Sequence, residues 1–203
     1  MPAISAKIVN WNGFISTVGD INMHADVEKI LVSEKEIDEI TTRLAKEIDE
    51  DYKNSDKRLI LLCILKGSIV FMGDLMKKIT LPVEIDCMKV SSYGRGTNSS
   101  GTVNIHLDLV RPDLPDCDIL VIEDIVDSGI TLTYLVKYLL GKGAHSVRTC
   151  TLLDKPSRRK VDFVPDYCGT EIPDEFVVGY GLDFDERYRA LPYVGVLKPE
   201  VYS

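Results

Sequence analysis

Two uninterrupted apolar runs constrain the fold of this chain more than any other feature of its sequence. Residues 59–65 read LILLCIL and residues 119–122 read ILVI. Continuous apolar runs of this length are typical of strands that are covered on both faces. Each run is followed by a turn and then by a helical pattern, and strands that alternate with helices build a parallel sheet. We therefore predict an α/β fold with a mainly parallel central sheet flanked by helices.

The remaining patterns extend this alternation along most of the chain. A capping box, Ser33 with Glu36, opens an amphipathic pattern that predicts a helix over 34–52. Further helices are expected from the turn at 66–68 to residue 78, and before the glycines at 141 and 143. Further strands are expected over 83–90, 102–109, 147–153, 176–180 and 193–197.

Residues 1–26 show neither helical nor strand periodicity. We expect them to form an N-terminal extension that is disordered or loosely attached, followed by one domain over 27–203. An alternative is that Met23 is the first residue of the native protein.

Charge and cysteine content exclude several classes of function. The chain has 24 Lys and Arg residues against 32 Asp and Glu residues, a net charge of −8, which argues against nucleic-acid binding. No window reaches the roughly 18 to 20 apolar residues that span a bilayer, so no membrane partner is expected. The five cysteines are odd in number and lack C-x-x-C spacing, and no secretory signal is visible. A reduced, cytoplasmic protein is expected, and small anionic ligands remain possible.

The segment 121–132, VIEDIVDSGITL, carries the strongest functional signal. Glu123 and Asp124 end a buried strand, where carboxylates are costly unless something uses them. Residues 127–131 then offer free N–H groups at a helix N-terminus, a favourable place for an anion. Carboxylates accept hydrogen bonds from sugar hydroxyls or hold Mg²⁺. A phosphate beside vicinal hydroxyls describes a ribose 5-phosphate group.

This segment resembles the phosphoribosyl pyrophosphate (PRPP) signature of the type I phosphoribosyltransferases. From about residue 27 to 203 the chain is similar to bacterial hypoxanthine-guanine phosphoribosyltransferases. The resemblance implies a small hood subdomain formed mainly by 155–203, with part of the N-terminal segment. It also implies Mg²⁺-dependent transfer of the phosphoribosyl group from PRPP to N9 of hypoxanthine or guanine in purine salvage, which gives IMP or GMP and pyrophosphate. Members are commonly homodimers or homotetramers.

The resemblance also implies roles for individual residues. Glu123 and Asp124 would hold the ribose hydroxyls, and Asp127 would be the catalytic acid or base at the purine N7. The other proposed residues are Ser128, Gly129, Ile130 and Thr131 for the phosphate, Lys66, Gly67 and Arg189 for pyrophosphate, Ser92 and Tyr93 for a catalytic lid, Lys155, Phe176, Val177 and Asp183 for the purine, and Asp183, Glu123 and Asp124 for Mg²⁺. The family also has a non-proline cis peptide at the position of Leu65-Lys66. Ile130 is a departure, because some relatives have lysine there.

Simpler interpretations exist for several of these residues. Without the resemblance, Lys66 reads as a solvated lysine at a strand end, and Lys155 as part of a basic loop with Arg158 and Arg159. The loop at 94–101 equally suits an ordinary hairpin, and 183–187 a solvated acidic turn. Rival functions are phosphoribosyl transfer to xanthine or another base, a PRPP-sensing regulator without enzymatic activity, and an anion-binding structural protein.

Overall fold

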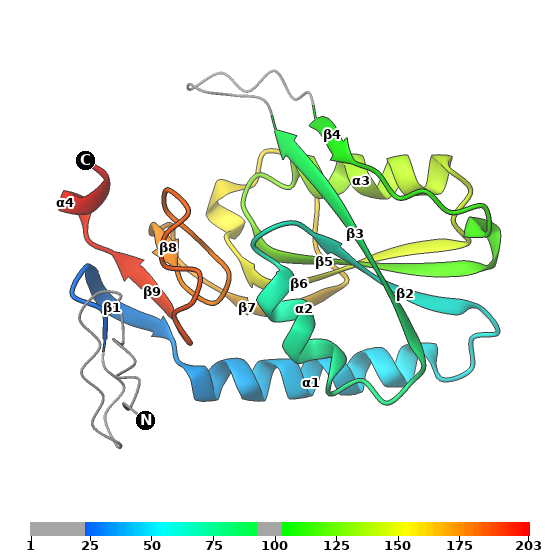
Figure 1. Ribbon diagram of the computed structural model, residues 1–203, viewed down its shortest axis with the longest axis horizontal. Coiled ribbons are helices and arrows are strands. Elements are labelled where there is room, and N and C mark those ends of the chain that lie inside the picture. Colours follow the sequence, from blue (N-terminus) through cyan, green and yellow to red (C-terminus); the bar gives the residue numbers. More distant parts are fainter. Residues whose placement is uncertain (1–22, 93–102) are drawn as a thin grey trace, which may run out of the picture.

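The two apolar runs become neighbouring strands at the centre of a six-stranded sheet (Figure 1). They form β2 (Arg58–Ile64) and β5 (Cys117–Val126), which pair in parallel with Leu61 opposite Leu120. The strand order is β4-β3-β2-β5-β6-β7, and only β4 runs antiparallel to its neighbour. The prediction of a mainly parallel α/β sheet is confirmed.

The computed structural model describes residues 23–92 and 103–203. The other strands of the large sheet are β3 (Val83–Ser92), β4 (Val103–Leu107), β6 (Ser146–Asp154) and β7 (Tyr167–Glu171). The helices are α1 (Glu34–Tyr52), α2 (Ile69–Met76), α3 (Ile130–Gly141) and α4 (Pro199–Tyr202), with short 3₁₀ turns at Leu114–Asp116 and Pro156–Arg158. Within the described ranges, no helix has both the length and the apolar character needed to cross a bilayer.

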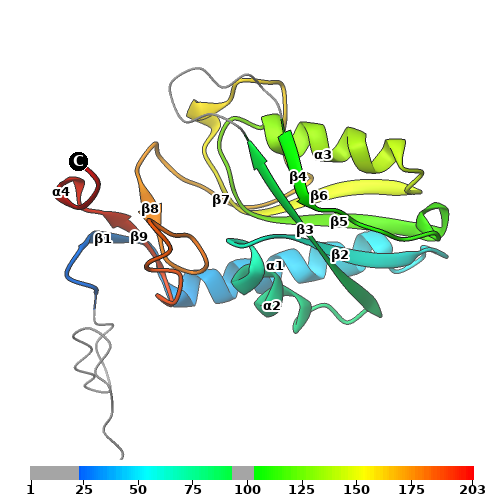
Figure 2. The same ribbon diagram turned by 45° about the horizontal axis from the view of Figure 1, so that its top comes forward.

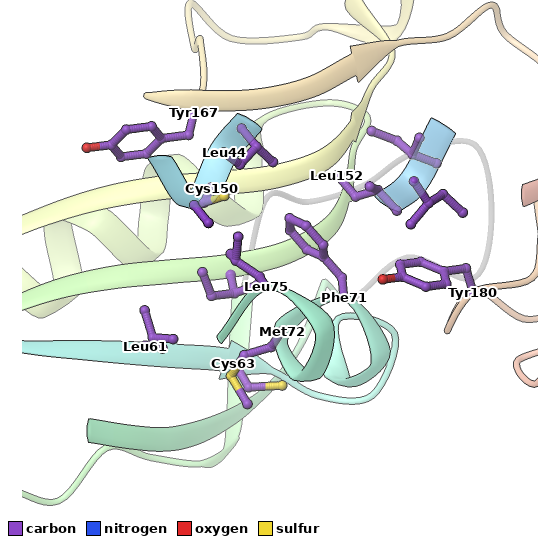
Figure 3. Packing of buried hydrophobic residues seen from close by; sticks show 14 of the residues in the cluster. Leu44, Leu61, Cys63, Phe71, Met72, Leu75, Cys150, Leu152, Tyr167 and Tyr180 are labelled. Carbon is purple, nitrogen blue, oxygen red and sulfur yellow. The ribbon is translucent and has the colours of Figure 1, made fainter. Parts of the chain in front are cut away.

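Helices cover both faces of the sheet, as continuous apolar strands require. Leu120 and Ile122 of β5 pack into the same cluster as the buried residues of α1 and α2, part of which Figure 3 shows. Ile119 and Val121, which alternate with them, pack against α3 on the opposite face. Since successive side chains of a strand point to opposite faces, the run ILVI contributes side chains to the hydrophobic cores on both faces of the sheet.

A second, three-stranded antiparallel sheet with order β1-β9-β8 stands beside the first, and we call it the hood (Figures 1 and 2). It joins β1 (Val27–Val32) to β8 (Val177–Val178) and β9 (Val194–Leu197), so opposite ends of the chain meet there. Residues just before β1 are also attached to it. The Tyr188 hydroxyl donates to the Asp26 carboxylate at 2.7 Å, and Lys198 N–H donates to the Asp26 carbonyl at 3.0 Å.

The structure corrects several expectations about boundaries. His24 and Asp26 contact the C-terminal part of the chain, so the loosely attached extension does not reach residue 26. Residues 1–22 lie outside the described part. Within 155–203, β7 belongs to the large sheet, and the hood sheet combines β8 and β9 with β1 from the N-terminal part of the chain. Strands β1 and β7 were not predicted, α2 ends at Met76 before the expected residue 78, and β8 has only two residues. The helix over 34–52 and its capping box are confirmed.

Candidate active site

The carboxyl ends of three parallel strands bring the predicted segments together. Lys66-Gly67 follows β2, the phosphate loop (residues 127–131) follows β5, and Lys155 follows β6. Lys155 N–H donates to the carbonyl of Val126 at 2.9 Å, and its ammonium lies 3.8 Å from a carboxylate oxygen of Asp127. This edge of an open α/β sheet is where ligands bind.

The phosphate loop ends in the N-terminus of α3. Its N-cap residue Gly129 has φ of 78°, a left-handed conformation that glycine adopts at little cost. Ile130 N–H donates to the Ser128 hydroxyl at 3.3 Å, and Thr133 N–H donates to the Gly129 carbonyl at 3.0 Å. The first turn of a helix has N–H groups without intrahelical acceptors, and the helix dipole adds positive potential there. Replacing lysine by isoleucine at residue 130 leaves these backbone donors in place.

Glu123 and Asp124 lie inside β5, which continues for two residues beyond Asp124 to Val126 rather than ending at these acids as the sequence suggested. Burial raises the pKa of the Glu123 carboxyl well above its ordinary value, and the neighbouring Asp124 raises it further. Burial also raises the pKa of Asp124, although the positive charge of Arg189 acts in the opposite direction. One carboxyl oxygen of Glu123, Oε2, is buried with no hydrogen-bond partner among the described residues. A buried acceptor without a partner is what a ribose hydroxyl would satisfy.

The loop after β2 contacts Asp124 directly. The expected cis peptide between Leu65 and Lys66 is present. A β-carbon added to Gly67 would lie 1.5 Å from Asp124 Oδ2, so only glycine lets the loop approach this acid. The carbonyl of Gly67 is in turn close to Gly181 of the hood, where an added β-carbon would lie 2.0 Å away. Loop, acid pair and hood therefore meet at one point.

A carboxylate that the sequence did not single out joins the two predicted pyrophosphate cations. Glu186 accepts from the Lys66 ammonium at 2.9 Å and from the Arg189 guanidinium at 3.1 Å. Arg189 also pairs with Asp183 at 2.8 Å, while its Nε is buried without a partner in the described part of the chain. These two cations, Lys66 and Arg189, hold the pKa of Glu186 below its ordinary value. Both cations are therefore paired with carboxylates of the protein itself.

The predicted purine residues lie where β6 meets the hood. Lys155 is only 7% exposed, so it does not belong to a solvated loop, and its ammonium donates to the Glu175 carbonyl at 2.7 Å. Phe176 directly precedes β8 and is held by Leu197 N–H, which donates to its carbonyl at 2.9 Å. The Phe176 ring is 39% exposed and stacks on Tyr202 of α4 at 4.8 Å and 22°. Val177, in contrast, is buried in β8.

The acidic residues do not form an all-protein metal site. Across residues 23–92 and 103–203, no three His, Cys, Asp or Glu side chains come together as metal ligands would. Glu123, Asp124 and Asp183 therefore do not make one cage. Mg²⁺, however, is usually bound by one or two carboxylates together with water and substrate phosphates. A single carboxylate such as that of Asp183, next to the cluster of Lys66, Glu186 and Arg189, fits that mode of binding.

Two predicted residues receive no further structural test. Ser92 is the last residue of β3, and its side chain is not described. Tyr93 lies outside the described residues, so the predicted lid remains a prediction.

Comparison with known proteins identifies the family. The phosphoribosyl transferase domain family matches residues 28–185. Hypoxanthine-guanine phosphoribosyltransferase of Bacillus subtilis is 51% identical over 181 residues, which are 89% of this chain and 99% of that protein. The chain belongs to the phosphoribosyltransferase family. The resemblance stated from its sequence is confirmed.

Two further relatives are similar to this phosphoribosyltransferase over most of its length. The crystal structure of a hypoxanthine phosphoribosyltransferase from Staphylococcus aureus superposes with a TM-score of 0.84 and 46% identity, covering 92% of this chain and all of that one. The bifunctional protein TilS/HprT of Listeria monocytogenes is 49% identical over 185 residues, which are 91% of this chain. This chain spans only 28% of that longer relative's length.

Proposed function

We propose that this chain transfers the 5-phosphoribosyl group of PRPP to N9 of hypoxanthine or guanine, forming IMP or GMP and pyrophosphate in purine salvage. The observation that carries the proposal is the meeting of three sites at one sheet edge. The phosphate loop, the buried acid Glu123 with its unpaired Oε2, and the base-site residues Lys155 and Phe176 match the phosphate, ribose and purine of one nucleotide. The similarity to hypoxanthine-guanine phosphoribosyltransferases supports the same substrates.

Binding of PRPP would use two anion sites on either side of the acid pair. The N–H groups of Ser128, Gly129 and Thr131 and the hydroxyls of Ser128 and Thr131 would hold the 5-phosphate, while Glu123 and Asp124 accept hydrogen bonds from the ribose diol. Lys66 and Arg189 would leave Glu186 and neutralise the pyrophosphate, the kind of electrostatic stabilisation that usually dominates catalysis. Bound beside Asp183, Mg²⁺ would supply further positive charge to the leaving group.

The purine would lie against the exposed face of Phe176. The Lys155 ammonium has donors and no acceptor, so it matches the 6-oxo group of hypoxanthine or guanine and not the 6-amino group of adenine. Asp127, 3.8 Å from Lys155, would accept or return the proton at N7 as the C1′ bond to pyrophosphate breaks. Buried carboxylates nearby would favour the oxocarbenium-like ribose of the transition state.

The proposal also covers the cellular compartment and the oligomeric state. All five cysteines are free thiols, which suits a reducing compartment, and we place the enzyme in the cytoplasm. We expect a homodimer or homotetramer, as in the family.

Steady-state assays with PRPP and four purine bases test this function. We expect turnover with hypoxanthine and guanine and none with adenine. The kcat/KM for xanthine, compared with those two values, shows whether xanthine is also a substrate. In the same assay Asp127→Asn should lower kcat by about 100-fold or more with little change in the KM for PRPP. Tight PRPP binding without turnover of any base would instead indicate a regulator, and no PRPP binding would refute the proposal.

A further inference from the structure

Arg159 lies in a stretch that reads as a solvated basic loop, yet its side chain is only 15% exposed. One nitrogen, Nη1, donates to the carbonyl oxygen of Asp127 at 2.6 Å. The other, Nη2, is paired with the carboxylate of Asp154, a residue of β6 that is itself buried. The guanidinium thus ties the first residue of the phosphate loop to the strand that ends beside Lys155.

The residues around Arg159 also close over the outer side of the phosphate loop. Lys160 N–H donates to the carbonyl of Ser128 at 3.0 Å. A β-carbon added to Gly129 would lie 3.0 Å from Arg159 Cδ and 3.0 Å from the β-carbon of Phe163. The loop is therefore packed against the segment from Arg159 to Phe163 on one side, with two consecutive carbonyl groups engaged.

A peptide unit is rigid, so a contact that fixes its carbonyl group also fixes the direction of its N–H group. In a planar trans peptide the C=O and the following N–H point in opposite directions. The only cis peptide in the described residues is Leu65-Lys66, so both peptides of the loop are trans. When Arg159 and Lys160 hold the carbonyls of Asp127 and Ser128, the N–H groups of Ser128 and Gly129 must point away from them.

We propose that Arg159 is a positioning residue, which aims two backbone N–H groups at the 5-phosphate without touching the substrate. This inference rests on the proposed function and assigns that site a residue outside its binding loop. Lysine would not replace it, because the planar guanidinium reaches the Asp127 carbonyl and the Asp154 carboxylate at once, whereas an ammonium is a compact point charge.

The test separates phosphate recognition from recognition of the rest of the nucleotide. Binding of IMP and of inosine, which lacks only the phosphate, is measured by calorimetry on wild-type protein, Arg159→Lys and Asp154→Asn. We expect Arg159→Lys to reduce the ratio of IMP affinity to inosine affinity by about tenfold or more, with inosine affinity changed less than about twofold. Asp154→Asn should act in the same direction but less, and the KM for PRPP should rise while the KM for hypoxanthine stays constant.

Arg158→Lys is the matched control, because Arg158 is 52% exposed and its ion pair with Asp174 at 3.4 Å lies outside the loop. It should leave both affinities unchanged. An unaltered IMP-to-inosine ratio in Arg159→Lys, or an equal loss of both ligands, would overturn the positioning role. Wild-type protein that binds IMP no better than inosine would instead count against the proposed function itself.

Discussion

Replacing Gly67 by alanine should disable the PRPP site through a single steric conflict. The new β-carbon would lie 1.5 Å from Asp124 Oδ2 and 2.6 Å from Asp124 Cγ, so the carboxylate must retreat by about 2 Å to reach ordinary contact. The side chain is buried, and its Oδ1 accepts from Ile125 N–H at 2.7 Å. Breaking that hydrogen bond leaves a buried acceptor unpaired, which costs about 1–3 kcal/mol. We expect kcat/KM for PRPP to fall by about 5- to 150-fold.

Gly73→Ala is the matched control for this change. Gly73 lies inside α2, and a β-carbon there meets nothing within 4 Å. Alanine should stabilise the helix by about 0.5–1 kcal/mol and leave catalysis intact. Steady-state kinetics with varied PRPP, together with thermal unfolding, compare the two variants. A Gly67→Ala enzyme with wild-type kcat/KM would refute the placement of Asp124 against this loop.

Three further predictions test other parts of the site. Glu186→Gln removes the acid paired with Lys66 and one of the two acids paired with Arg189, so the KM for PRPP should fall by about two- to fivefold, the range of exposed ion pairs. A higher KM would show that Glu186 assists binding. Tyr202→Leu removes the stacked ring that backs Phe176 and should raise the KM for hypoxanthine by about two- to tenfold, while Tyr202→Phe changes little; a lower KM would mean that Tyr202 blocks the base. Because burial raises the Glu123 pKa above 4.5, the folded state loses stability as pH rises from 4.5 towards that raised value. Glu123→Gln should therefore raise Tm at pH 7 more than at pH 4 while weakening IMP binding, and an equal gain at both pH values would contradict the raised pKa.

Much of the large sheet could be predicted because its pattern is local. The runs in β2 and β5 are apolar throughout, and the helix after Ser33 carries its own capping signal. Strands β1 and β7 have no such signature. β1 becomes a strand by pairing with β9, where Val27 lies opposite Leu197 at the other end of the chain. In β7, Gly169 is pressed against the Leu152 carbonyl of β6, a contact that no local pattern contains.

The candidate site also contains residues that the sequence suggested and residues that it did not. The resemblance proposes roles for Asp127 and Lys155, and both residues directly follow strands at the same edge of the sheet. Glu186 and Arg159 could not, since a charged side chain in a polar stretch is usually solvated. Their partners lie far away in sequence: Glu186 meets Lys66 across 120 residues, and Arg159 meets Asp127 across 32. Only the folded chain shows that these charges contact residues of the candidate site.

A crystal structure of the protein with bound IMP tests the central claim most directly. The account predicts that the phosphate accepts hydrogen bonds from the N–H groups of Ser128, Gly129 and Thr131. It also predicts that Glu123 and Asp124 accept from the two ribose hydroxyls, with the purine on Phe176. IMP bound elsewhere, or bound at this edge of the sheet with its phosphate away from the start of α3, would contradict it.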